Sequence, residues 1–271
     1  MNYDYAIHSS FLIHWTGKDI DDLYDKKWYE SDKSKTNKNC DVGSLYIKRL
    51  HDILKYGLWM TEENELRFSE IVIPTIPKTC FTELKISESR KHAKQYGRLG
   101  IGVKRRFVFD RLGRPLIYFH EKRLSTDKFL TTCSKELNDK KLLNFFKPMN
   151  SSEILNFDLY GESEWRILFF KELLSKKLII DPRNQENTEE YSYFCSLPLS
   201  DQDKLKYLIP LCGWFVMIIY PSLEVKNSAQ QDESNGIKAQ IKRIKEIVDH
   251  GNTVEGSNWP IEIDLDACRN F

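Results

Sequence analysis

An interrupted apolar run at residues 207–220 constrains the fold of this chain more than any other feature of its sequence. Pro210 and Gly213 break the run, whereas a membrane helix needs roughly 20 apolar residues in succession. We therefore interpret residues 213–220, GWFVMIIY, as a strand buried within a sheet. This interpretation predicts a protein that does not enter membranes.

The composition is typical of a folded, reduced protein. Of the 271 residues, 41% are hydrophobic and 13% aromatic, which is too apolar for a disordered chain. The 6 cysteines are spread singly, without a C-x-x-C pair, so we predict neither a zinc site nor a redox pair. Residues 1–10 lack the charged-then-apolar order of a signal peptide, and we expect a cytoplasmic location.

The predicted elements form a mixed α+β layout in which strands and helices do not alternate regularly. Residues 44–56 show helical spacing and end at a capping Gly57; their predicted buried face is Tyr46, Leu50, Ile53 and Leu54. We expect further helices at 85–95, 137–146 and 237–248, and strands at 11–15, 71–73, 79–82 and 261–266. Residues 99–109 and 116–119 are predicted to pair as a hairpin, whereas 165–170 fits either a strand or part of a helix.

The first polar group that points to chemistry is His14 and Thr16, at the end of the first predicted strand. Residues two apart share one face of a strand, so both side chains are able to reach the same ligand. The plainer alternative is a core histidine with satisfied hydrogen bonds, followed by a capping threonine.

A second group is the tetrapeptide C-F-T-E at residues 80–83, where polar side chains follow an aromatic residue at a strand end. Thr82 is placed to brace a neighbouring carboxylate, and Phe81 offers a stacking face. The alternative is that Thr82 caps the helix that follows, which its position before Glu83 supports equally well.

A third group combines glycines with basic residues. Gly97, Gly100 and Gly102 permit close backbone approach, but they do not open a helix and no Lys-Ser/Thr follows, so a phosphate loop is excluded. The segment between Arg98 and Arg123 carries a local excess of positive charge, although the whole chain has a net charge of only +1. This strip suggests contact with a phosphate backbone, while a solvated face is the commoner explanation.

A fourth group is G-E-S-E-W-R at residues 161–166. Glu162 and Glu164 lie on one face if the segment is extended. One carboxylate beside aromatic residues can stabilise an oxocarbenium ion, and its neighbour can orient a nucleophile. The alternative is a surface run in which the carboxylates pair with Arg166.

Taken together, these motifs resemble the AbiGi family of bacterial abortive-infection (phage-resistance) proteins. The resemblance spans about residues 11–225 and follows the order H-W-T, L-H-D-I-L-K-Y-G-L-W, C-F-T-E, Y-G-R-L-G-I-G-V, G-R-P-L-I-Y-F and E-S-E-W-R. We therefore predict a domain over residues 1–225, and a helix-strand extension over residues 226–271 that packs on the same domain.

The same order of motifs is similar to the ADP-ribosyltransferase fold, a split and mostly antiparallel β core with flanking helices. The resemblance implies that NAD is the substrate and that Glu164 is the catalytic carboxylate, with Glu162 orienting the acceptor. It further implies that NAD contacts a second set of residues: His14, Thr16, Phe81, Thr82, and either Tyr96 or Tyr56 as the ring that stacks on nicotinamide.

Two functions of different classes follow. The first is a phage-defence effector, an NAD-dependent mono-ADP-ribosyltransferase that modifies protein or nucleic acid and is restrained by a protein from the same defence operon, an antitoxin or chaperone. Single-stranded nucleic acid would bind along the strip between Arg98 and Arg123. The second is a non-catalytic antitoxin or sensor that binds a partner toxin. A nuclease is disfavoured because no Asp/Glu-x-Lys pattern adjoins a second metal ligand.

Overall fold

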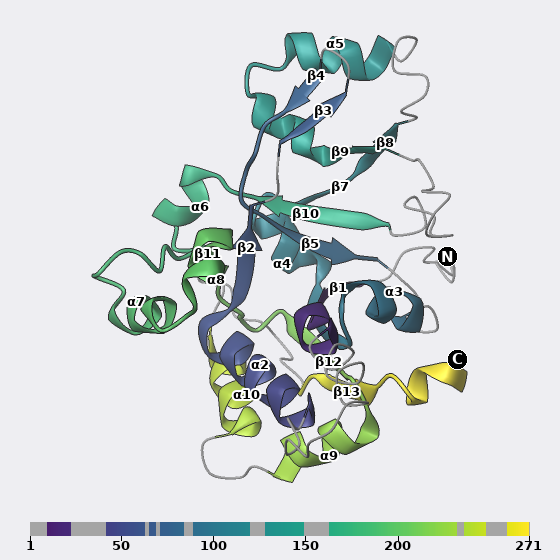
Figure 1. Cartoon of the computed structure of the whole chain (residues 1–271), viewed down its shortest axis with the longest axis vertical. Coiled ribbons are helices and arrows are strands. Elements are labelled where there is room, and N and C mark those ends of the chain that lie inside the picture. Colours follow the sequence, from purple (N-terminus) through teal and green to yellow (C-terminus); the bar gives the residue numbers. More distant parts are fainter. Residues whose placement is uncertain are drawn as a thin grey trace, which may run out of the picture. The chain divides into compact units, whose positions relative to one another are not determined.

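The computed structural model describes residues 10–22, 42–62, 65–68, 71–83, 89–119, 128–148, 163–231, 236–247 and 259–270. The chain divides into two compact units that are interleaved in sequence (Figure 1). The first unit takes Met1–Gly57, Glu83–Phe107 and Leu211–Phe271, and the second takes Leu58–Thr82 and Val108–Pro210. The chain passes from the first unit to the second within helix α4 (Arg105–Asp110).

The sheet of the first unit has the order β1 (Phe11–Thr16), β6 (Leu99–Lys104), β12 (Phe215–Tyr220) and β13 (Ile261–Asp264). The β1–β6 and β6–β12 pairs are antiparallel, whereas β12 and β13 run parallel. Strands β6 and β12 each have neighbours on both sides and are almost wholly buried. A strand buried on both faces is continuously apolar, which confirms the strand predicted from the run at 213–220.

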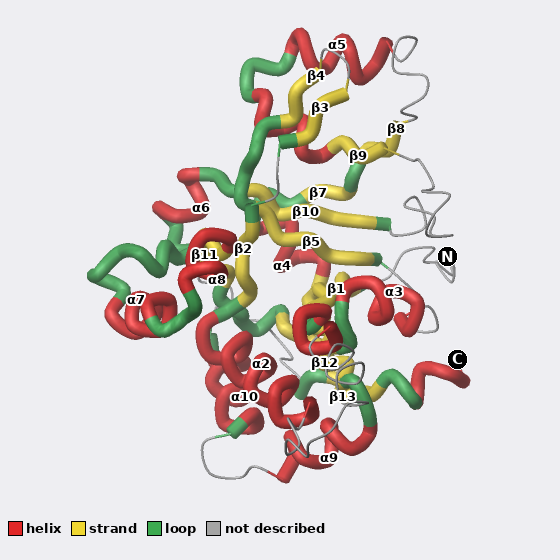
Figure 2. Tube along the Cα trace, viewed as in Figure 1, coloured by secondary structure: helices red, strands yellow, loops and turns green. Residues whose placement is uncertain are grey.

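The helices of the first unit are α2 (Val42–Tyr56), α3 (Ser89–Tyr96), α9 (Leu223–Gln231) and α10 (Ile237–Glu246). Helix α2 packs against α9 and α10, and α3 packs against β1 (Figure 2). The buried face of α2 is the predicted one, Tyr46, Leu50, Ile53 and Leu54. Gly57 adopts φ +110° directly after this helix, as a C-cap requires, and the predicted helix and its end are confirmed.

The sheet of the second unit is antiparallel throughout its described pairs. Its order is β11 (Leu205–Ile209), β2 (Leu58–Thr61), β5 (Lys78–Thr82), β10 (Glu164–Leu168) and β7 (Arg114–Pro115). Strand β10 is buried along its whole length, and its pairing with β5 and β7 shows that residues 164–168 form a strand. Three short helices lie between β10 and β11: α6 (Lys171–Ser175), α7 (Thr188–Cys195) and α8 (Leu199–Lys204).

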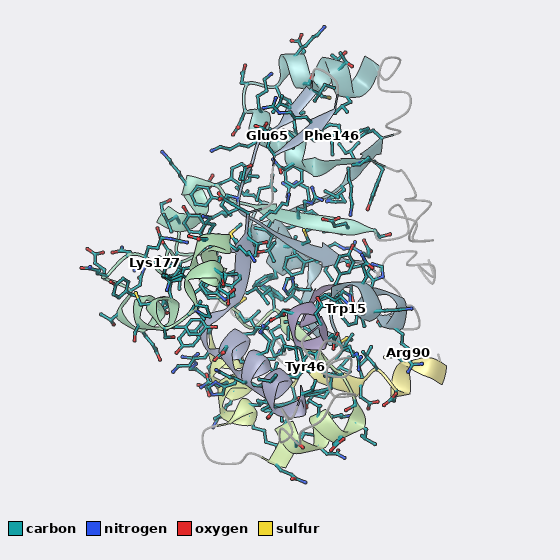
Figure 3. The ribbon with its side chains drawn as sticks, in the orientation of Figure 1. Trp15, Tyr46, Glu65, Arg90, Phe146 and Lys177 are labelled. Atoms are coloured by element: carbon teal, nitrogen blue, oxygen red, sulfur yellow. The ribbon has the colours of Figure 1, made fainter. Side chains whose placement is uncertain are left out.

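Two small sheets complete the second unit. Strands β3 (Leu66–Phe68) and β4 (Ile71–Ile73) pair antiparallel, and β8 (Ile117–Phe119) and β9 (Phe146–Pro148) pair parallel. Helix α5 (Lys128–Glu136) and the 3-10 helix η3 (Lys140–Phe145) lie between β8 and β9 in the chain. Their shared core is formed by Ile71, Ile73, Phe119, Leu130, Leu143 and Phe146, the last labelled in Figure 3.

The fold class is confirmed at the level of a mixed α/β chain with mostly antiparallel sheets and flanking helices. The predicted hairpin is wrong. Residues 99–104 form β6, which pairs with β1 and β12, while the residues that follow turn into α4 instead of extending the strand. Residues 117–119 pair with β9. Across the described segments, no helix is both long and apolar enough to cross a bilayer.

Candidate functional site

His14 and Thr16 occupy one face at the end of β1. The intervening Trp15 and the preceding Ile13 point into a buried cluster with Met217 and Ile219, whereas His14 and Thr16 are half-buried. The alternation places both candidate side chains away from this core, as the strand spacing predicts.

Two glycines bring the end of β1 into backbone contact with the end of α3. Gly17 adopts φ +101° and Gly97 adopts φ +105°, both in the left-handed region. A Cβ atom on Gly97 would lie 2.3 Å from the backbone nitrogen of Lys18 and 2.4 Å from the carbonyl oxygen of Thr16. The glycine of the Y-G-R motif is therefore required by the close approach of two backbones.

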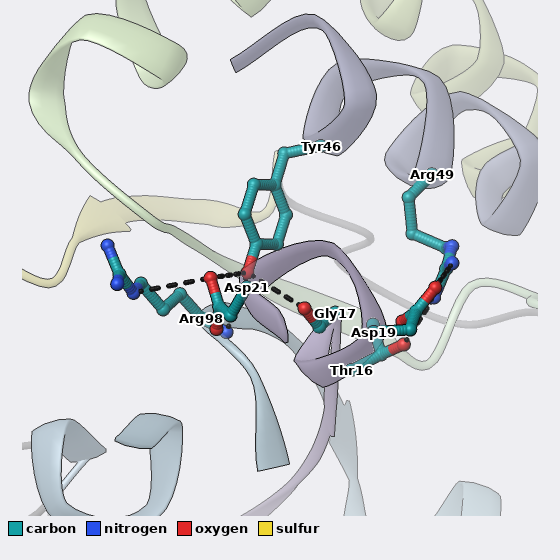
Figure 4. Close-up of polar contacts among 7 residues, drawn as sticks. All are labelled: Thr16, Gly17, Asp19, Asp21, Tyr46, Arg49 and Arg98. Carbon is teal, nitrogen blue, oxygen red and sulfur yellow. Dashed lines mark hydrogen bonds and ion pairs between the residues drawn. The ribbon is translucent and has the colours of Figure 1, made fainter. Parts of the chain in front are cut away.

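Tyr46 fixes the turn that follows β1. Its hydroxyl donates to Asp21 Oδ1 at 2.7 Å and lies 3.1 Å from the carbonyl oxygen of Gly17 (Figure 4). Arg98 donates its backbone N–H to the same hydroxyl at 3.3 Å, and its Nε lies 3.4 Å from Asp21 Oδ1. Burial, followed by the hydrogen bond to Asp21, raises the pKa of Tyr46, so that the phenol stays a neutral donor.

Arg49 holds the hydroxyl of Thr16. Its Nη1 donates to Thr16 Oγ1 at 3.1 Å, and the two ends of the guanidinium bind Asp19 Oδ1 at 3.2 Å and Oδ2 at 2.6 Å (Figure 4). This fork-to-fork pairing orients the guanidinium. Because Thr16 accepts this bond, its own proton is available to donate elsewhere. Sequence reasoning missed Arg49, since helical spacing marks only the apolar face of α2.

The two candidate stacking tyrosines lie in the first unit at the ends of helices. Tyr96 ends α3, is 36% exposed, and its ring centroid lies 5.8 Å from that of His92. Tyr56 ends α2, with Lys55 Nζ 5.0 Å from its ring centroid.

In the second unit, the C-F-T and E-W-R motifs are direct neighbours across two strands. Strands β5 and β10 pair so that Glu164 lies opposite Thr82 and Trp165 lies opposite Phe81. All four residues are buried, with Glu164 at 6% and Thr82 at 7% exposure. The sheet therefore joins two motifs that are about 80 residues apart in the sequence.

Glu164 lies between two cations. Its Oε1 accepts from Arg166 Nε at 2.6 Å and its Oε2 from Lys147 Nζ at 2.5 Å. Burial raises the pKa of Glu164, but the charges of Arg166 and Lys147 and their hydrogen bonds outweigh it and lower the pKa to about 2. The carboxylate is thus ionised at neutral pH although it is buried.

Further contacts anchor this ion triad within the second unit. Arg166 Nη1 donates to the carbonyl oxygen of Asn144 at 2.7 Å, and Asn144 Nδ2 donates to the carbonyl oxygen of Pro74 at 2.9 Å. The backbone N–H of Glu164 donates to the hydroxyl of Tyr118 at 3.0 Å. The network links β10 to η3, to β8 and to the loop after β4.

The structure thus brings the predicted residues together in two separate sets. His14, Thr16 and Tyr96 belong to the first unit, whereas Phe81, Thr82 and Glu164 belong to the second. Glu162 lies outside the described residues. Ser163, the first described residue of this segment, adopts φ +43° and is therefore not extended.

The described part of the basic strip makes contacts within the protein. Arg98 pairs with Asp21, Arg105 Nη2 lies 2.5 Å from Glu83 Oε1, and Arg111 is only 2% exposed. Arg114 lies over the ring of Phe109 at 5.4 Å. Much of the local excess of positive charge is therefore explained by arginines that form ion pairs or pack within the protein.

Comparison with known proteins gives no match to a protein-family model, to a curated protein or to a solved structure. Within the described segments, no group of three or more His, Cys, Asp or Glu side chains is arranged to hold a metal ion.

Proposed function

We propose that the protein is a phage-defence effector of the AbiGi type, which transfers ADP-ribose from NAD to a macromolecular acceptor. The observation that carries this proposal is the direct pairing of Thr82 on β5 with Glu164 on β10. The pairing supports an ADP-ribosyltransferase-like core, because in that superfamily the second polar motif braces the pocket in which the glutamate acts.

Glu164 has the electrostatic character that the reaction needs. As the bond between ribose C1′ and nicotinamide breaks, positive charge develops on the ribose, and an ionised carboxylate in a buried site stabilises it. The acceptor nucleophile then bonds to C1′ and loses its proton. In this proposal, Glu162 orients the acceptor, while His14 and Thr16 hold NAD, with Tyr96 or Tyr56 stacking on nicotinamide.

The proposal includes a cellular setting. The effector acts in the cytoplasm, and a protein of the same defence operon restrains it, as an antitoxin or chaperone. The acceptor is a protein or a single-stranded nucleic acid. For nucleic acid, basic side chains of the strip between Arg98 and Arg123 would contact the phosphates.

The test is release of nicotinamide from NAD by the purified protein, measured together with growth on expression in bacteria. We expect turnover and growth arrest from the wild type, and loss of both in Glu164→Gln. Glu164→Asp keeps the negative charge but shortens the side chain. If this variant folds and lacks turnover, the defect is catalytic and does not come from misfolding. Glu172→Gln is the matched control, because Glu172 is exposed and pairs only locally with Lys176. Turnover that survives Glu164→Gln would remove Glu164 from the mechanism.

One observation favours the second candidate, a non-catalytic antitoxin or sensor. Both carboxylate oxygens of Glu164 are engaged by cations, as in an ion triad that only stabilises the fold. This candidate predicts no NAD turnover by the wild type, no toxicity on expression, and rescue of growth when the neighbouring toxin is co-expressed.

A further inference from the structure

We propose that Lys147 restrains the active site. Its ammonium is hydrogen-bonded to Oε2 of Glu164 and has to move away before the carboxylate can contact the ribose of NAD. This inference rests on the proposed function and adds a form of regulation to it. It makes the described structure a resting state in which the catalytic carboxylate is paired with a competing cation.

The two cations beside Glu164 differ in how they are attached. Arg166 is two residues away on the same strand, its side chain is 8% exposed, and its Nη1 is fixed on the carbonyl oxygen of Asn144. Lys147 belongs to β9, which pairs with β8; Leu116, directly before β8, donates its N–H to the carbonyl oxygen of Glu164 at 2.9 Å. Arg166 therefore lies on the same strand as Glu164, whereas Lys147 reaches the carboxylate from another strand through its side chain.

The chemistry of the two side chains also makes Lys147 the more mobile of the two cations. The guanidinium of Arg166 is a rigid fork, already committed at both Nε and Nη1. The ammonium of Lys147 is a point charge on a flexible stem of four carbons, which allows it to move without a change in the backbone. Its side chain is 15% exposed, about twice the 7% exposure of Glu164.

Charge explains why Lys147 opposes the reaction. The oxocarbenium-like ribose is itself a cation and would approach the oxygen that now lies 2.5 Å from Lys147 Nζ. While Lys147 is paired with Oε2, its ammonium repels an approaching cation. Once Lys147 withdraws, this repulsion is removed, and Oε2 is able to stabilise positive charge.

The experiment compares nicotinamide release by the wild type, Lys147→Met and Lys147→Arg. Methionine keeps an unbranched apolar stem and removes the charge. We expect Lys147→Met to raise kcat at least about tenfold, and Lys147→Arg to match the wild type or fall below it. Lys141→Met, at an exposed position six residues earlier in η3, is the matched control and is expected to change nothing.

Two additions separate restraint from a purely structural role. The double variant Lys147→Met/Glu164→Gln is expected to be inactive, because the gain operates through Glu164. The acid limb of the pH profile of kcat/KM is expected to move to higher pH in Lys147→Met, since one of the two cations that keep Glu164 ionised is gone. If Lys147→Met does not fold by circular dichroism, Lys147→Gln takes its place.

The outcomes distinguish this inference from the proposed function. A wild type that turns over NAD, with a folded Lys147→Met that is equal or slower, overturns the restraint and leaves the transferase intact. A silent wild type with an active Lys147→Met supports both. Absence of nicotinamide release from both folded proteins overturns both.

Discussion

Glu164 shows how neighbouring charges decide the state of a buried carboxylate. Burial alone would favour the protonated acid, yet Arg166 and Lys147 lower the pKa to about 2. A buried ion pair contributes little compared with an apolar replacement, but removal of one partner leaves the others uncompensated. The stability of the second unit should therefore depend on the charge of this side chain.

This dependence can be measured as a function of pH. The folded pKa of Glu164 lies below the ordinary value of 4.5, so its contribution is full above about pH 4.5 and is lost as the pH falls toward 2. We expect Glu164→Gln to lower the free energy of unfolding by roughly 3–5 kcal/mol at pH 7. The difference from the wild type should shrink as the pH falls toward 2.

Urea denaturation at pH 7, 5, 4 and 3 would check this, with Glu172→Gln as the control at an exposed site. A difference that is the same at pH 7 and pH 3 would contradict the role of the ionised carboxylate.

The individual side-chain contacts of the site could not be predicted from the sequence alone. The spacing of His14 and Thr16 predicts that they share a strand face, because that periodicity is local. Arg49 and Lys147 carry no such signal, since each meets its partner only after the chain folds back over 33 and 17 residues respectively. Ser163 has a left-handed backbone that nothing in its residue type indicates.

Among whole elements, predictions succeeded where the signal is contained within the element. Helix α2 is marked by its apolar spacing and its glycine cap, and α10 by Ile237, Ile241 and Ile244, all buried as expected. The hairpin failed because β6 finds its partners in β1 and β12, far away in the sequence. Apolar residues resume at Phe107 after Lys104, Arg105 and Arg106, and a run this short does not show whether it continues the strand.

The C-terminal end of α6 provides a test at this scale. Lys177 adopts φ +56° just after the helix, where Leu178 donates its N–H to the carbonyl oxygen of Leu173 at 2.8 Å. This left-handed capping position favours glycine, which has no Cβ atom to strain. Lys177 is exposed and labelled in Figure 3.

We expect Lys177→Gly to raise the free energy of unfolding by about 0.5–1 kcal/mol, measured by chemical denaturation. Lys177→Ala removes the same charge without relieving the backbone and serves as the control. Equal effects of the two substitutions would show that charge, and not backbone conformation, limits this position.

On the scale of the whole chain, the sequence boundary predicted at residue 225 falls inside α9. The described elements of residues 226–271 belong to the first unit: α10 packs against α2, and β13 pairs with β12. The boundary follows the extent of the resemblance, which gives no information on packing, and both units are assembled from stretches that are distant in sequence.

A chain that ends at residue 225 should therefore be strongly destabilised. It loses β13 and the buried isoleucines of α10, each of which contributes roughly 1.5–3 kcal/mol through burial. We expect loss of the cooperative thermal transition by circular dichroism. A chain that ends at Asp266, lacking only the last 3-10 helix η5 (Ala267–Asn270) and the final residue, is the control and should keep its transition. An unchanged transition in the shorter chain would contradict the packing role of α10 and β13.

The placement of β6 between β1 and β12 sets an order of events during synthesis. Gly100 of β6 pairs with Trp15, which the ribosome has already released, but its other partner, Ile219, is made roughly 120 residues later. At about 5–20 residues per second, β6 waits about 6–24 s with one edge uncovered. Most of that interval is spent on Val108–Pro210, which complete the second unit after Leu58–Thr82. The first unit therefore closes its sheet only after the second has been made.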